Sequence, residues 1–200
     1  RNDGEKSVWS LTEGRRATVE NAKKAADMGV DMIVLTGNPG VGVDNKAITK
    51  ALADLNEAVG DRVILTAGKM HASGILSEAG EKILTKEDAE TFIEAGADVL
   101  LLPAPGTVPG FTMEHAAELI KTAHEKGVLA MTTIGTSQEG ADEETIRQIA
   151  LMCKMAGADI HHIGDSGYMG MALPENITAY SVAIRGKRHT YRRMAMSLVR

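Results

Sequence analysis

The chain has 200 residues, of which 44% are hydrophobic and 24% charged, and its formal net charge is −5. This composition is typical of a globular domain with a buried core, and it excludes a disordered chain. The acidic balance gives no reason to expect nucleic acid or an anionic membrane as a partner. The single cysteine, Cys153, excludes an internal disulfide, and no apolar run is long enough to cross a bilayer. We therefore expect a cytoplasmic protein.

The N-terminal residues 1–13 are polar and are predicted to form a loop, and residues 14–200 are predicted to form one domain. The chain begins with Arg1 rather than methionine. We therefore expect that further sequence precedes it in the native protein.

One pattern recurs along the chain: a helical segment ends at glycine, and a short apolar segment follows at once. The glycines are Gly29, Gly60, Gly96, Gly127 and Gly157, which lie 31, 36, 31 and 30 residues apart. A βα unit takes about this length, and glycine suits the residue after a helix because that residue often needs positive φ. The pattern therefore predicts repeated βα units.

The apolar segments are continuous rather than alternating, as in parallel strands that are covered on both faces. Those predicted as strands are residues 32–36, 62–66, 99–102, 129–133 and 160–163. Apolar residues at helical spacing predict helices over 14–28, 113–126 and 143–155, and residues 73–82 also look helical.

Strict alternation of strand and helix predicts a parallel sheet, which is either a doubly wound open sheet or a (β/α)8 barrel of the TIM type. Alanine-rich helix faces and nearly uniform units favour the barrel. So does the lack of a Gly-x-Gly-x-x-Gly turn after the first strand. Five strands do not close an eight-stranded barrel. We therefore predict that the chain holds about five C-terminal βα units, with about three N-terminal units missing or supplied by another chain.

Small polar residues are concentrated in the loops that follow the predicted strands, where parallel α/β folds bind ligands. The candidate anion-binding residues in these loops are Asn38, Thr107, Thr136, Ser137, Gly164, Ser166 and Gly167. Their backbone N–H and hydroxyl groups can hold a phosphate or a carboxylate. Turn formation alone also explains these residue types.

The candidate catalytic residues are Lys69, His71 and Asp165. A desolvated lysine at a barrel rim can form a Schiff base with a carbonyl substrate, and a solvated or anion-pairing lysine is the alternative. His71 can act as an acid or base, or cap the helix that follows. Asp165 can act as an acid or base, or bind a metal.

Two adjacent histidines, His161 and His162, lie in the last predicted strand and must face opposite sides of the sheet. The inward one can relay a proton or bind a metal together with Asp165, and a buried, hydrogen-bonded histidine is the alternative. We take His162 and Asp165 as candidate ligands of a divalent metal such as Mg²⁺. The basic segment 185–193 is expected to be a solvated or subunit-contacting helix, or else a docking surface for an anionic ligand.

Residues 31–40, 67–71, 101–107 and 161–168 together resemble an uncharacterised bacterial barrel family. Its members are loosely labelled phosphoenolpyruvate-phosphonomutase-like, or haloacid-dehalogenase-like hydrolases. The resemblance begins at about Thr12 and implies longer proteins with further N-terminal strands. Residues 164–168 are similar to the Asp-containing loop of phosphonomutase and isocitrate-lyase barrels, and residues 69–71 to a second loop of those enzymes. The two loops occur in reverse order and the catalytic cysteine is absent, so the resemblance implies a small anionic ligand without that mechanism.

The sequence therefore predicts a lyase or mutase of the phosphate-binding or enolpyruvate-type barrel class. Its substrate would be a small anionic carbonyl or phosphorylated compound. One alternative is a class I aldolase that uses Lys69, and another is a non-catalytic ligand-binding or structural barrel. We expect a small anionic metabolite as the ligand, no nucleic acid or membrane as a partner, and a homo-oligomer.

Overall fold

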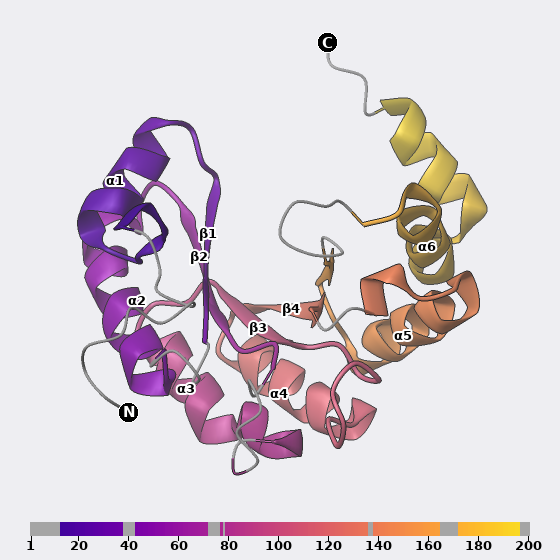
Figure 1. Cartoon of the computed structure of the whole chain (residues 1–200), viewed down its shortest axis with the longest axis horizontal. Coiled ribbons are helices and arrows are strands. Elements are labelled where there is room, and N and C mark those ends of the chain that lie inside the picture. The colour runs from indigo at the N-terminus through magenta and orange to yellow at the C-terminus, as the bar shows by residue number, and fades with distance from the viewer. Residues whose placement is uncertain are drawn as a thin grey trace, which may run out of the picture.

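The computed structural model describes residues 13–37, 43–71, 77, 79–135, 138–164 and 172–196. Within them, five parallel strands pair in the order β1-β2-β3-β4-β5. The strands are β1 Met32–Thr36, β2 Ile64–Gly68, β3 Val99–Pro103, β4 Leu129–Ile134 and β5 Ile160–Ile163. The sheet is curved, the helices lie on its outer side, and the whole forms an open arc (Figure 1).

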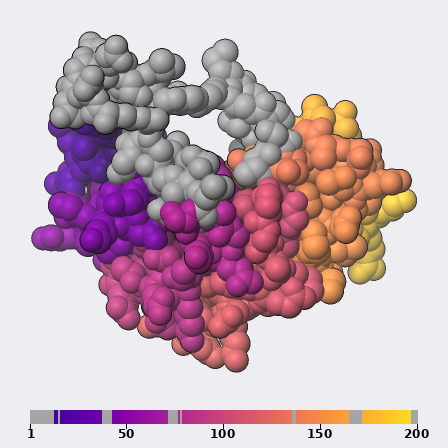
Figure 2. Space-filling model, turned by 60° about the horizontal axis from the view of Figure 1, so that its bottom comes forward, coloured from indigo at the N-terminus to yellow at the C-terminus, as the bar shows by residue number. Residues whose placement is uncertain are grey.

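The helices alternate with the strands along the chain. In the space-filling view, the colours run around the molecule in chain order, from indigo to yellow (Figure 2). The α-helices are α1 Val19–Asp27, α2 Asn45–Val59, α3 Lys86–Glu94, α4 Met113–Glu125, α5 Glu143–Ala156 and α6 Pro174–Met196. Short 3-10 helices are η1 Glu13–Arg15, η4 Gly80–Ile83 and η5 Gln138–Gly140. In this part of the chain, no helix combines the length and apolar character needed to span a membrane.

Helix boundaries follow from local side-chain chemistry. The first five α-helices each begin after a Thr or Asp whose side chain accepts a hydrogen bond from a backbone N–H in the first turn, and each such cap is worth about 1 kcal/mol. These caps are Thr18, Asp44, Thr85, Thr112 and Asp142. At the other end, Gly29, Gly96, Gly127 and Gly157 have positive φ, as the repeat predicts. Gly60 differs, because its φ is −63° and it continues the helical turn of α2.

Two predicted boundaries are wrong. Strand β2 begins at Ile64 rather than Arg62, because the amides of Arg62 and Val63 still bond to the carbonyl of Val59 at the end of α2. Helix α1 begins at Val19 rather than near residue 14, because Thr18 caps it and η1 is a separate turn. In the region 73–82, the described residues contain only short 3-10 turns, η4 among them.

The Gly-x-Asp turns of the repeat tie neighbouring strands together at their amino ends. The carboxylate of Asp98, just before β3, accepts the amide of Leu65 in β2 at 2.8 Å. The carboxylate of Asp159, just before β5, accepts the amide of Ala130 in β4 at the same distance. Each aspartate thus bonds to the strand on its N-terminal side. These turns therefore have a structural role.

The two faces of the sheet differ in burial. The outer face packs against the helices through fully buried residues such as Leu65, Leu100, Leu52 and Phe92. Each of these contributes about 2 kcal/mol by leaving water. The inner face has a smaller buried cluster formed by Val99, Leu101 and Met131. Three further apolar side chains on this face, Val34, Ile64 and Leu129, are 43%, 44% and 48% exposed. The chain therefore forms a half-barrel whose concave face is open.

Strands β2 and β3 approach each other most closely at Gly68, the last residue of β2. A Cβ atom at Gly68 would lie 1.8 Å from the carbonyl oxygen of Leu101, which is a backbone atom and cannot move aside. At Gly140, by contrast, a Cβ would meet no atom within 4 Å.

We predict that Gly68→Ala lowers the free energy of unfolding by about 3 kcal/mol or more, because β3 must move away from β2. Gly140→Ala serves as the control and should change the stability by less than about 0.5 kcal/mol. Urea denaturation followed by circular dichroism measures both. Equal stability of Gly68→Ala and the unsubstituted chain would contradict the close approach.

Candidate functional site

The parallel strands place the loops after all five strands along one edge of the sheet, which we call the carboxyl rim. Of the candidate residues on this rim, the structure describes Lys69, His71, Thr107, His162 and Gly164. Asn38, Thr136, Ser137, Asp165, Ser166 and Gly167 lie outside the described residues. Their predicted roles therefore remain predictions.

Lys69 follows the last residue of β2 and is only 2% exposed. Its aliphatic stem packs beside Gly37 at the end of β1 and near Ile48 in α2. A Cβ atom added at Gly37 would lie 3.2 Å from Cγ of Lys69 and 3.0 Å from Cδ1 of Ile48. The missing side chain at position 37 thus leaves room for the lysine. Fully buried lysines are rare, since removing the amine from water is costly. Lys69 is therefore the most unusual residue on the rim.

The two residues after Lys69 carry the loop inward across the rim. Met70 packs with the inner-face cluster, and its Sδ would lie 2.8 Å from a Cβ atom added at Gly135, just after β4. The side chain of Met70 therefore extends from the loop after β2 to the residue that follows β4. His71 lies next in the chain and is half-buried, and burial lowers its pKa. Its imidazole is therefore neutral at pH 7 and able to accept a proton.

The histidine pair of β5 is divided between the two faces. The Nδ1 atom of His161 lies 3.0 Å from the hydroxyl oxygen of Tyr180 in α6, so His161 belongs to the helix side. His162 is in register with Thr133 on the inner face. Within the described residues, no group of three or more His, Cys, Asp and Glu side chains could hold a metal ion. Because Asp165 lies outside them, the metal site remains a prediction.

Thr107 and Gly164 have local structural contacts. Thr107 is buried, and its hydroxyl donates to the carbonyl of Ala104 at 2.7 Å, inside the loop after β3. Gly164 follows β5, and a Cβ atom there would lie 2.5 Å from the carbonyl oxygen of Ile134. The backbone of Gly164 therefore packs directly against the end of β4.

Glu139, which lies in η5 after β4, is a rim residue that the sequence analysis missed. It is only 6% exposed, and within the part of the chain that the structure describes its Oε2 atom has no hydrogen-bond partner. This oxygen would lie 3.4 Å from a Cβ atom at Gly164. A buried carboxylate oxygen without a donor costs free energy, and such a cost is typical of functional sites.

Asn176, near the start of α6, holds η5 in place. Its Nδ2 donates to the backbone carbonyls of Glu139 and Ala141, both at 2.8 Å. The sequence around Glu139 is polar and reads as a surface loop. Its burial depends on a residue 37 positions later in the chain, and no local pattern reveals that contact.

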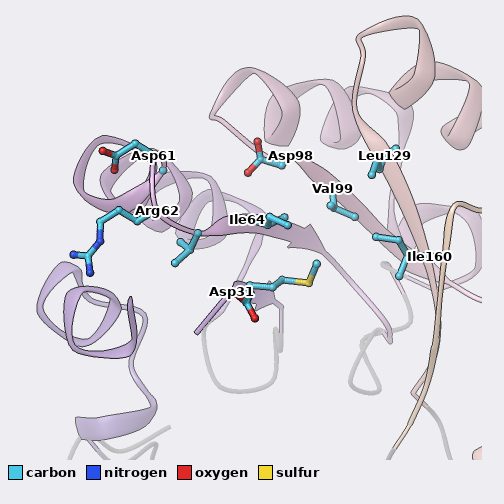
Figure 3. Close-up of a pocket in the computed structure, with 11 residues that line it drawn as sticks. Asp31, Asp61, Arg62, Ile64, Asp98, Val99, Leu129 and Ile160 are labelled. Atoms are coloured by element: carbon cyan, nitrogen blue, oxygen red, sulfur yellow. The ribbon is translucent and has the colours of Figure 1, made fainter. Parts of the chain in front are cut away.

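The opposite end of the strands contains a hollow of about 510 Å³ (Figure 3). Consecutive strands contribute its apolar lining, and Asp31, Asp61, Arg62 and Asp98 lie near its edge. The apolar lining residues are Met32, Ile64, Val99, Leu129 and Ile160. Inward apolar side chains from neighbouring strands form the core layers of closed barrels. We therefore interpret this hollow as the open core of the half-barrel.

The fold and the rim define the class: an α/β protein with a TIM-barrel-like half-barrel. Over residues 1–200 the chain matches, and therefore belongs to, the family described as "Domain of unknown function (DUF7916)". No curated protein matches it in sequence.

Solved structures share the fold. One is the deoxyribose phosphate aldolase of Aeropyrum pernix, with a TM-score of 0.60 and 21% identity over 86% of this chain and 68% of that one. Another is an archaeal fructose 1,6-bisphosphate aldolase, with a TM-score of 0.60 and 18% identity over 82% and 62% of the two chains. A third is a provisionally named phosphonomutase from Burkholderia cenocepacia J2315, with a TM-score of 0.57 and 18% identity over 82% and 71%. At these identities the likeness shows the fold alone, and the chain spans about two thirds of these proteins.

The lowered pKa of His71 gives a prediction in solution. In the imidazole NMR signals, His71 should titrate with a midpoint below the usual value of about 6.5. Because folding favours the neutral form, stability is retained above the usual pKa and falls as the pH drops through the pKa of the folded state. A midpoint at or above 6.5 would contradict the described burial.

Proposed function

We propose that this protein is an enzyme that acts at its carboxyl rim on a small anionic carbonyl compound, with Lys69 forming a Schiff base to the carbonyl carbon. The observation that carries the proposal is the 2% exposure of Lys69 at the end of β2. The aldolases that share the fold support a carbonyl substrate only as analogy. The sequence leaves open a lyase or mutase, an aldolase and a non-catalytic barrel. Of these, the buried lysine favours a lyase that forms a Schiff base, such as an aldolase.

The chemistry requires two events on the rim. In the first, the neutral Nζ atom of Lys69 attacks the carbonyl carbon and one of its protons passes to the carbonyl oxygen. That oxygen takes a second proton from a general acid and leaves as water, and a C=N⁺ bond forms. In the second, a C–H or C–C bond next to this carbon breaks, and its electron pair moves toward the nitrogen. A base must then accept a proton, either from the carbon or from a substrate hydroxyl.

Glu139 is the described group best suited to accept that proton. Its Oε2 atom is buried and has no hydrogen-bond partner among the described residues, so it is suited to accept a hydrogen bond from a ligand. A series of contacts along the rim connects Glu139 with the residue after Lys69. The side chain of Met70 reaches Gly135, which follows Ile134 in β4. Ile134 pairs with Ile163 in β5, and the next residue, Gly164, lies beside Glu139. His71 is a second candidate base.

The Schiff base can be trapped covalently. The full chain is treated with sodium borohydride in the presence of pyruvate, acetaldehyde or dihydroxyacetone phosphate, and its peptides are analysed by mass spectrometry. At least one of these compounds should add its mass to the peptide that contains Lys69. Lys69→Arg should lose the label, because a guanidinium does not form the adduct. Lys50→Arg, at an exposed lysine, should keep it. Labelling spread over exposed lysines, or no label at Lys69 with any of the three, would refute the proposal.

The role of Glu139 has a separate test. With the compound that traps, exchange of the hydrogens next to the carbonyl with D₂O is followed by NMR. Glu139→Gln should slow this exchange by about 10²- to 10⁴-fold, while borohydride still labels Lys69. The control, Glu144→Gln, removes an exposed carboxylate at the start of α5 and should exchange at the original rate. Unchanged exchange in Glu139→Gln with labelling intact would remove Glu139 from the mechanism and leave Lys69 in place.

We also propose that the half-barrel is part of an eight-stranded barrel, with further parallel strands beside β1. The exposed apolar residues of the inner face support this, as do the longer chains of the solved structures. Asp31 gives a more specific argument. It occupies the position before β1 that Asp98 and Asp159 occupy before β3 and β5, where each accepts an amide from the preceding strand. In the described part of the chain, β1 has no neighbour on that side. Asp31 is therefore suited to accept an amide of a strand beside β1.

The other roles that the sequence predicts for rim residues are proposed as well. An anion held by Asn38, Thr136, Ser137, Ser166 and Gly167, with Thr107 and Gly164 beside them, is compatible with this substrate class. Acid–base chemistry at Asp165 is also compatible with this substrate class. So is a Mg²⁺ ion held by Asp165 and His162. A homo-oligomer is proposed by analogy with the tetrameric aldolase of Aeropyrum pernix.

A further inference from the structure

The last helix carries a basic hollow that has no part in the proposed rim chemistry. Helix α6 bends at Gly186, where φ is 77° and ψ is 161°. The part before the bend packs against α5, and the part after it projects away from the sheet (Figure 1). The described residues that line the hollow all belong to α6: Arg185, His189, Arg192, Arg193 and Met196. Its volume is about 470 Å³, which lies in the range of small-ligand pockets.

Specific contacts hold the bend in place. The hydroxyl oxygens of Ser181 and Thr190, one on each side of Gly186, lie 3.0 Å apart, and Thr190 is only 2% exposed. The Nζ atom of Lys154 in α5 donates to the carbonyl of Ile184 at 2.8 Å, at the end of the first part of the helix. The basic side chains therefore project from a fixed backbone.

The charge of this region has no counterpart nearby in the chain. No Asp or Glu occurs after Glu175, whereas residues 185–193 contain five Lys and Arg residues. Among the described residues, Arg185, Arg192 and Arg193 form no ion pair, and the protein as a whole is acidic. Burial lowers the pKa of His161, and the positive charge of Arg185 lowers it further. Cations left without counter-charges around one hollow favour an anionic ligand.

We propose that this hollow binds a small ligand that carries two linked phosphate groups. A guanidinium group can donate two parallel hydrogen bonds to phosphate oxygens, and three such groups from one helix line the hollow. A ligand with two linked phosphate groups offers these three guanidinium groups more charge and more acceptor oxygens than a single phosphate does. Met196 at the edge provides an apolar contact for the rest of the ligand. The hollow is a binding site separate from the rim, and it does not depend on the reaction proposed there.

The test uses inorganic pyrophosphate as the probe and the full chain as the protein. Isothermal titration calorimetry at low and at physiological ionic strength should show saturable binding of one pyrophosphate per chain. The double variant Arg192→Gln/Arg193→Gln should weaken this binding by about tenfold or more, because it removes charge-assisted hydrogen bonds.

The matched control is Lys187→Gln/Arg188→Gln, which removes two positive charges from the same part of α6 at positions that do not line the hollow. It should change the affinity by less than about threefold, since only long-range attraction is lost. If both double variants weaken pyrophosphate binding equally, the attraction is diffuse and the proposed site is wrong. Pyrophosphate binding that does not saturate would also overturn the proposal. A single-stranded oligonucleotide that binds more tightly than pyrophosphate, with both double variants weakened alike, would overturn it in favour of a nucleic-acid surface. Circular dichroism of each variant checks that α6 remains folded.

Discussion

The parallel pairing of β1 to β5 is the constraint on which the rest of the structure depends. Because the strands run in the same direction and in sequence order, every loop that follows a strand lies on the same rim. Residues far apart in the chain, such as Lys69 and Glu139, therefore lie along one edge of the sheet. The backbone approach at Gly68 is part of this pairing, and it fixes the end of β2 from which Lys69 emerges. Any change that shifts β2 relative to β3 would therefore move the proposed site.

The rim tolerates unfavourable burial because the outer face of the sheet is well packed. Lys69 and Glu139 are both more than nine-tenths buried, and one oxygen of Glu139 has no donor. A buried carboxylate oxygen without a donor destabilises a protein by about 1–3 kcal/mol. The fully buried leucines between the sheet and helices α2 to α4 offset that cost. The opposite end of the strands has no comparable feature among the described residues, since its aspartates Asp98 and Asp159 are bonded to strand amides.

The periodic features of the fold could be predicted from the sequence. The glycine repeat and the apolar segments identify all five strands, because parallel strands are uniformly apolar and helices end at glycine. The start of β2 was misplaced because Arg62 and Val63 look like a strand locally but bond back to α2. The position of Lys69 directly after a strand identifies it as a candidate. Its burial could not be predicted, because that burial depends on contacts with Gly37 and Ile48. Glu139 was missed for the same reason: Asn176, distant in sequence, anchors its turn.

We propose that the carboxyl rim, and not the hollow at the amino ends of the strands, binds the carbonyl compound. Hydrogen–deuterium exchange of the full chain, with and without pyruvate at millimolar concentration, tests this directly. The account predicts slower exchange in the peptides that contain Lys69 to His71 and Gly135 to Glu139, with little change around Asp31, Asp61 and Asp98. Slower exchange confined to the amino ends of the strands would contradict it.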